Sequence, residues 1–107
     1  MAGSRIANES PVFQGAAEKL AYGLTTTPWG ASPTNESMAV YDITDPENED
    51  DVTTACTEGA MSVSGNVITT KRIKSLTLGN TYRVEVLFTD AQSNVWEMIF
   101  LIKCQDK

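Results

Sequence analysis

The stretch SLTLGNTYRVEVLFTD, Ser75 to Asp90, places the strongest constraint on what this chain of 107 residues can fold into. From its tyrosine onward, apolar and polar residues alternate. Alternation over this length predicts a β-strand with one buried face. The Gly-Asn pair just before it predicts a sharp turn, because glycine adopts backbone conformations that other residues avoid. The residues expected on the buried face are Tyr82, Val84, Val86 and Phe88.

A tyrosine that opens such a strand just after a turn is typical of a tyrosine corner. In this feature of Greek-key sandwiches the phenol hydroxyl bonds a backbone group a few residues upstream, while the ring fills the edge of the core. We therefore predict a structural corner formed by Leu76, Gly79 and Tyr82.

Other short apolar runs follow at intervals typical of all-β folds. EKLAYGLTTT (18–27) favours a strand by its alternate leucines and tyrosine, although GAAEKLAYG (15–23) has the composition of two helical turns. SMAVYDI (37–43) and VWEMIFLIKC (95–104) predict strands that are apolar on both faces, and DVTTAC (51–56) a short strand. MSVSGNVITT (61–70) predicts a hairpin, because glycine at the first central position suits a type II′ turn.

About seven strands are expected, and the predicted fold class is all-β. The architecture is a single immunoglobulin-like or fibronectin-III-like Greek-key β-sandwich over residues 12–107, preceded by a flexible N-terminal arm over residues 1–11. An up-and-down barrel is the alternative, although it would not need the corner. A chain of this size can be held by one hydrophobic core without metals or cross-links.

The amino-acid composition argues against several classes of function. A net charge of -6 with scattered Lys and Arg argues against binding nucleic acid or an anionic membrane surface. The chain has no histidine, so the commonest general base and metal ligand is missing. We predict no catalytic, cofactor-binding or metal-binding residues, and no enzyme activity. An enzyme would have to rely on carboxylates, lysine or tyrosine.

Several segments resemble small immunoglobulin-like proteins encoded by tailed phages and prophages. The likeness covers about residues 18–104 and includes a Val-Tyr-Asp strand, an Asp-Val-Thr segment and a Leu-x-x-Gly-x-x-Tyr-Arg run. It is more specific for fold than for role. Val84 stands where an antibody-type domain has its second cysteine, so the inter-sheet disulfide of that family is not expected. The matching residues are Leu20 and Tyr22; Val40, Tyr41 and Asp42; Asp51, Val52 and Thr53; Ser64, Gly65 and Asn66; and Leu76, Gly79, Tyr82 and Arg83.

The resemblance implies a non-catalytic structural module that makes protein–protein contacts in a phage particle, with other particle subunits or with itself as partners. It further implies synthesis in the cytoplasm of a bacterial host and then residence in the virion. MAGSRIANES lacks the apolar core of a secretory signal. Trp29, Ile99 and Leu101 are the candidate interface residues, since Ile99 and Leu101 lie on the second apolar face of the last strand. A surface adhesive or carbohydrate-binding module is the alternative, with Trp29 as its platform.

Two further groups of residues are candidate sites. Acidic residues alternate in YDITDPENEDD (41–51), and oxygen ligands at this spacing suit calcium, although the glycine and glutamate of an EF-hand are missing. A charged loop that protects a sheet edge is the simpler interpretation. Cys56 and Cys104 are expected to be reduced thiols, because a reducing compartment removes the need for a bridge. The acidic residues are Asp45, Glu47, Glu49 and Asp51.

Overall fold

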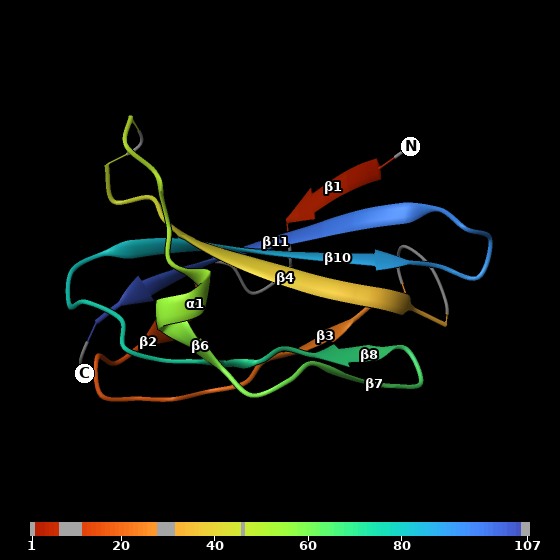
Figure 1. Ribbon diagram of the computed structural model, residues 1–107, viewed down its shortest axis with the longest axis horizontal. Helices are drawn as coiled ribbons and strands as arrows, with labels where there is room; N and C mark the ends of the chain where they lie inside the picture. The colour runs from red at the N-terminus through yellow and green to blue at the C-terminus, as the bar shows by residue number, and fades with distance from the viewer. Residues whose placement is uncertain (1, 7–11, 28–31, 46, 106–107) are drawn as a thin grey trace.

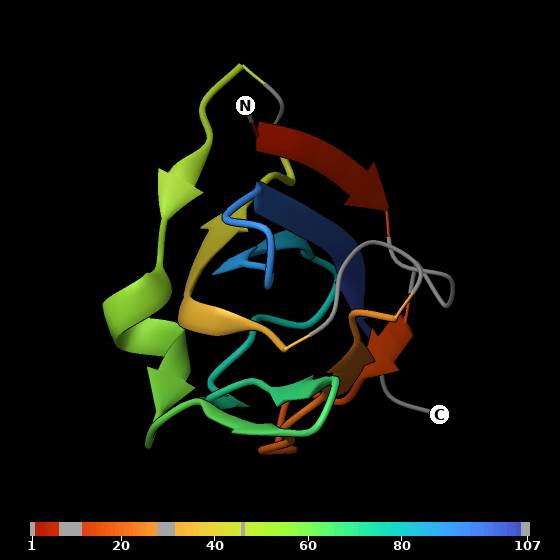
Figure 2. The same ribbon diagram turned by 90° about the vertical axis from the view of Figure 1, so that its right-hand side faces the viewer.

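The computed structural model describes residues 2–6, 12–27, 32–45 and 47–105. These form eleven strands and one short helix, so the fold is all-β, as the sequence predicts. The strands lie in two layers that face each other across the core, compatible with a β-sandwich (Figures 1 and 2). The eleven described strands exceed the seven expected, and several of them are only two or three residues long.

The first layer is a six-stranded mixed sheet built around two long strands. β10 and β11 pair along their whole length, and β4 pairs with β10 on its other side. At the outer edge of β11, β1 and β2 pair with opposite ends of that strand, both in parallel. The bounds are β1 (Ala2–Ile6), β2 (Val12–Gln14), β4 (Thr34–Asp42), β5 (Asp50–Asp51), β10 (Thr81–Thr89) and β11 (Val95–Cys104), in the spatial order β1-β11-β10-β4-β5.

The alternation of β10 and β11 builds most of the core. Every second side chain of β10 is buried, and the half-buried ones between them form the sheet's other face. β11 follows the same rule from Met98 to Cys104, whereas Trp96 is half-buried and packs against the core. The buried face predicted for the run from Tyr82 to Phe88 is therefore confirmed. A strand with one face on a core buries every second residue. Core members include Val40, Ile68, Ile73, Tyr82, Val84, Val86, Phe88, Met98, Phe100 and Ile102.

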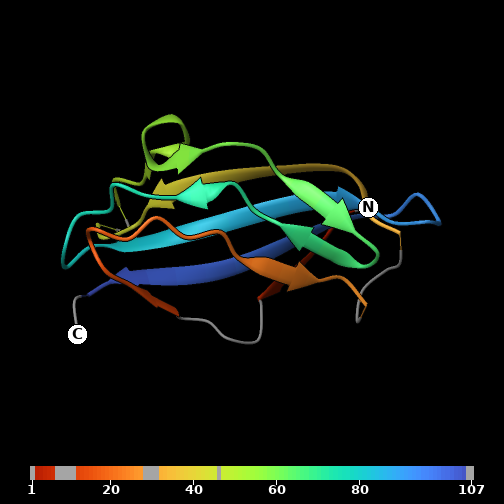
Figure 3. The same cartoon turned by 90° about the horizontal axis from the view of Figure 1, so that it is seen from below.

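The second layer consists of short strands. β3 (Gly23–Thr25) pairs with β8 (Val67–Thr69), which pairs with β7 (Ser62–Ser64), and β6 (Thr57–Glu58) pairs with β9 (Arg72–Ile73). Figure 3 shows this layer lying over the long strands of the first. A bridge between Leu20 and Ile73 joins the segment before β3 to β9. The segment 18–27 is thus extended in part and not helical, as its alternation favours.

The β7–β8 hairpin has the predicted turn. Ser64 pairs with Val67, so Gly65 and Asn66 are the two central residues. Gly65 has a φ of 59°, and Asn66 is not among the described residues with positive φ. This combination fits a type II′ turn and excludes type I′, which needs positive φ at both positions.

The prediction of a strand over DVTTAC is wrong. Thr53–Cys56 form a single helical turn, α1, between β5 and β6. Asp51 causes the change, because its side chain accepts hydrogen bonds from the Thr53 N–H and hydroxyl at 3.0 and 2.7 Å. Such a local side-chain bond competes with a strand ladder and turns the chain. Nothing helical in the described ranges has the length and apolar character needed to cross a membrane.

The strand predicted over residues 37–43 begins earlier than expected, because β4 starts at Thr34. Asn35 has a φ of 53°, and the β4–β10 register shifts between Leu87 and Thr89. Asparagine tolerates this left-handed conformation better than most residues, so the irregularity falls at a position that the sequence allows.

The N-terminal segment also differs from expectation. We predicted an arm outside the domain over residues 1–11, yet Ala2–Ile6 form β1 and pair with Val95–Ile99. The outer edge of β11 has unpaired backbone groups beyond β2, and a further extended segment satisfies them. Met1 and residues 7–11 lie outside the described residues, and a domain boundary at residue 11 stays a prediction.

Candidate functional site

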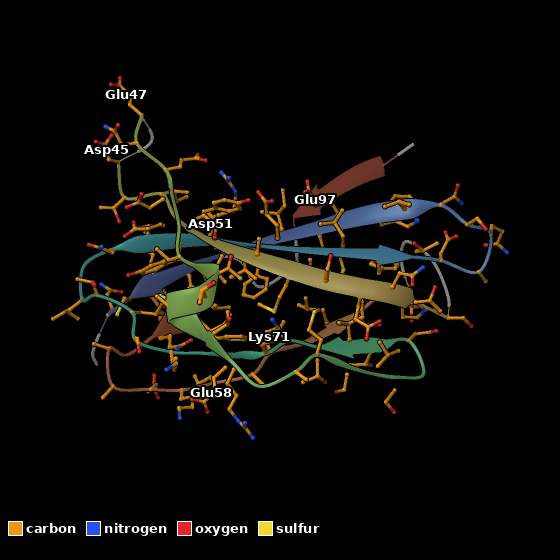
Figure 4. The ribbon with its side chains drawn as sticks, in the orientation of Figure 1. Asp45, Glu47, Asp51, Glu58, Lys71 and Glu97 are labelled. Atoms are coloured by element: carbon orange, nitrogen blue, oxygen red, sulfur yellow. The ribbon has the colours of Figure 1, made fainter. Side chains whose placement is uncertain are left out.

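Ile99 and Leu101, two of the predicted interface residues, lie on the outer face of the first layer. They alternate with the buried Met98, Phe100 and Ile102, so their side chains face away from the core. Both are half-buried. Figure 4 labels their neighbour Glu97 on the same side of β11, away from the second layer. We call this surface, formed by β2, β4, β10 and β11, the outer face.

A neighbouring strand extends this apolar strip. Phe13 on β2 pairs with Lys103, which puts the phenyl ring on the outer face beside Lys103, two residues along β11 from Leu101. Its side chain is 52% exposed, a high value for a phenylalanine. On the other side, the β10 partners of Ile99 and Leu101 are the charged Glu85 and Arg83, so the apolar strip does not continue there. Sequence reasoning missed Phe13, although the Val-Phe-Gln alternation of a three-residue strand was a weak signal for it.

Charged residues border the strip on its β10 side. The Arg83 guanidinium forms two hydrogen bonds to the Glu49 carboxylate, at 3.0 and 2.9 Å, and one to Glu85 at 2.7 Å. It also lies 5.1 Å from the centre of the Tyr41 ring, in cation–π contact. The hydrogen bonds that Arg83 donates to Glu49 and then to Glu85 raise the pKa of Arg83. The hydrogen bonds from Arg83 in turn lower the pKa of Glu49. Arg83 and Glu49 therefore stay ionised, and their pairing fixes the acidic loop against the sheet.

Leu76, Gly79 and Tyr82, for which a structural corner was predicted, lie at one end of the first layer. The Thr77 N–H donates a 2.8 Å hydrogen bond to the Tyr82 hydroxyl, and the tyrosine is only 2% exposed. Gly79 has a φ of 90°, which favours glycine, and its N–H bonds the Cys104 carbonyl at 2.8 Å. Leu76 is buried beside them. The turn is thus tied to β10 by a side chain and to β11 by the backbone.

The acidic loop does not gather its carboxylates. Asp45 accepts bonds from the Glu47 and Asn48 nitrogens, Glu49 pairs with Arg83, and Asp51 binds Thr53. Figure 4 shows Asp45 and Glu47 at the loop tip and Asp51 at its base. Over the described ranges, no three acidic or cysteine side chains come close enough to hold a metal ion. The geometry thus gives the calcium hypothesis no support, and hydrogen bonds explain why these residues lie where they do.

The remaining candidate residues are Trp29, Cys56 and Cys104. Trp29 lies outside the described residues. Cys56 and Cys104 are both buried, no disulfide joins them, and burial raises the pKa of the Cys56 thiol. A thiol with a raised pKa holds less of the nucleophilic thiolate, so Cys56 is unsuited to nucleophilic chemistry.

Comparison with known proteins adds no relative to this picture. No protein family model matches the chain, and no significant match was found among curated proteins.

Proposed function

We propose that this chain is a non-catalytic immunoglobulin-like module that acts through protein–protein contacts in a phage or prophage particle. The observation that carries the proposal is the apolar strip on the outer face, formed by Phe13, Ile99 and Leu101. An apolar strip on an ordered sheet, bordered by charges, is the usual composition of a protein interface. The phage setting rests on the sequence resemblance.

The immunoglobulin-like topology is part of the proposal. β3, β8 and β7 would take the places of strands B, E and D in one sheet, and β4, β10 and β11 those of C, F and G in the other. The bond from Thr77 to Tyr82 supports a tyrosine corner at the start of the F-like strand. Together they make the outer face a rigid surface held by long backbone ladders.

Rigidity is what suits this surface to docking. Few interface residues dominate binding; they lie near the centre of the patch and are most often aromatic residues or arginine. Phe13 and Leu101 can bury against a partner at little entropic cost, because both lie on paired strands. The Arg83 cluster at the border then selects for partner surfaces with complementary charge.

The composition of purified particles tests the proposal. Particles induced from the bacterium that carries this gene are purified on a density gradient, and their peptides are quantified by mass spectrometry. We expect the chain at a fixed ratio to the major particle proteins. Its presence in the cell lysate but not in the particles would refute the structural role. The carbohydrate-binding alternative rests on Trp29 and stays a prediction from the sequence.

A further inference from the structure

A second surface, distinct from the outer face, lies along the open edge of β4. One edge of β4 pairs with β10, but the other pairs with β5 only at Tyr41 and Asp42. At Val40 the outward backbone groups are also used, because its N–H bonds the Thr53 hydroxyl and its carbonyl accepts the Val52 N–H, both at 2.9 Å. Before Val40, therefore, no strand of the described ranges lies beside this edge.

Backbone direction alternates along a regular strand, so Met38 presents its N–H and C=O groups outward as Val40 does. Among the described residues, none forms a hydrogen bond to these two groups. Unpaired outward groups on an edge strand are a template for another extended segment.

A groove of about 480 Å³ runs beside this edge. Met38 lines it from β4, and Ala60 and Met61 line it from the segment before β7 in the other layer. Methionine side chains adapt to different apolar shapes, so the groove suits an inserted apolar side chain. The edge supplies backbone bonds and the groove supplies side-chain contact, which are the two components of strand-addition binding.

Charge points to the kind of segment that fits. Glu36 lines the groove from β4 and Lys71 from the segment between β8 and β9. Within the described part of the chain neither forms a salt bridge. Figure 4 shows Lys71 between β4 and the second layer. A segment with one basic and one acidic residue on either side of an apolar centre could form ion pairs with both Glu36 and Lys71.

We propose that this edge groove binds an extended segment of a partner protein, which adds to β4 as a strand. Its apolar side chains enter between Met38 and Met61, and its charged residues meet Glu36 and Lys71. A second copy of this chain fits less well, because each copy carries a net charge of -6 and would bring its own Glu36 to the shared edge.

Two synthetic peptides test this. Each has seven residues with leucine at the third and fifth positions and threonine at the second, fourth and sixth; one runs from lysine to glutamate and its twin from glutamate to lysine. We expect one twin to bind with a Kd below about 1 mM and the other about tenfold more weakly. The readout is an NMR titration, with the largest amide shifts at residues 36–38.

Variants of the chain show which surface is used. Ala60→Trp, at an exposed position, fills the groove and should weaken binding about tenfold. The double variant Glu36→Lys with Lys71→Glu should reverse the preference between the twins. Glu47→Lys is the control for charge, since Glu47 lies at the tip of the acidic loop, and Leu101→Glu is the control for the outer face; neither should change the affinity.

N-methylation of the peptide checks the backbone bonds. Methyl groups on the alternate amides that face β4 should abolish binding, whereas methyl groups on the other amides should leave it. Failure of both twins to bind, or binding that Ala60→Trp does not weaken, overturns the proposal. A dimer of the wild-type chain that Ala60→Trp converts to a monomer in sedimentation would assign the edge to a second copy instead, and would also overturn it.

Discussion

The two layers of this protein close the same core by different means. In the first layer, strands of nine and ten residues pair without interruption and bury one apolar side chain in every two. In the second, strands of two and three residues are joined by buried polar groups from Gln14, Thr26 and Thr70. Long backbone ladders and apolar burial therefore hold the first layer, whereas the second combines buried Ile68 and Ile73 with a few specific hydrogen bonds.

Several polar hydrogen bonds of the second layer are made by one buried side chain, that of Gln14. Gln14, fully buried, donates through Nε2 to the Ile73 carbonyl at 2.7 Å and to the Glu18 carbonyl at 3.0 Å. Its Oε1 accepts the Tyr22 hydroxyl at 2.6 Å. Burial and then nearby Glu18 raise the pKa of that tyrosine to about 12, so the hydroxyl remains a donor at any physiological pH. One side chain thus joins the edge of the first layer to two segments of the second.

The largest expected effect is a loss of volume in the first layer. Phe100 is buried on β11, and its ring lies 5.3 Å from the Tyr22 ring, centre to centre. Phe100→Ala should lower the free energy of unfolding by about 3 to 5 kcal/mol, because it leaves a cavity in the core. The long paired strands around the cavity cannot move in to fill it. Urea unfolding followed by fluorescence measures it. A loss below about 1 kcal/mol would mean that the first layer is loosely packed.

A smaller effect is expected from Gln14→Leu, which keeps the volume and removes the hydrogen bonds. Unfolding should become easier by about 1 to 3 kcal/mol, since the Tyr22 hydroxyl and the Glu18 carbonyl lose their partner. Hydrogen exchange should quicken at Leu20 and Ile73, whose amides bond each other's carbonyls, and remain slow in β10. Equal acceleration in both layers would remove the distinction drawn between them.

Tyr82→Phe should cost less, about 1 kcal/mol, because the ring stays and only the bond from the Thr77 N–H is lost. We expect the Thr77 amide to exchange faster, while Gly79, bonded to Cys104, remains protected. Hydrogen exchange by NMR resolves the two amides. If Thr77 exchanged at the wild-type rate, the hydroxyl would not be holding this turn.

The smallest effect concerns pH. Asp90, in the β10–β11 turn, accepts bonds from the Trp96 indole and from the Asn94 and Gln92 amides. These bonds, that from Trp96 first, lower its pKa below the ordinary 3.8. The stabilisation is therefore complete above that value and is lost as pH falls through the lower folded-state pKa. The urea midpoint should fall as the solution is acidified from about pH 5 to pH 2, and less so in Asp90→Asn. Identical acid profiles of the two proteins would contradict this.

The same contrast explains what the sequence could predict. The long alternation from Tyr82 to Phe88 and the glycine of the hairpin lead directly to β10 and to the type II′ turn. The turn of helix at Thr53 depends on one carboxylate of Asp51, and β1 on pairing with a strand some ninety residues away. Local patterns carry little information about either. In the outer face, Ile99 and Leu101 were predicted from periodicity, whereas Phe13 joins them only because β2 pairs with β11.

The most direct test of the central claim compares the two layers as binding surfaces. Leu101→Glu places a charge on the outer face of the first layer, and Val67→Glu places one at an exposed position in the second. Both variants are expressed in the bacterial host of the proposed phage particle, checked for folding by circular dichroism, and quantified in purified particles by mass spectrometry. We predict that Leu101→Glu is depleted from particles about tenfold and that Val67→Glu is retained. Equal retention of two folded variants would contradict docking through the outer face.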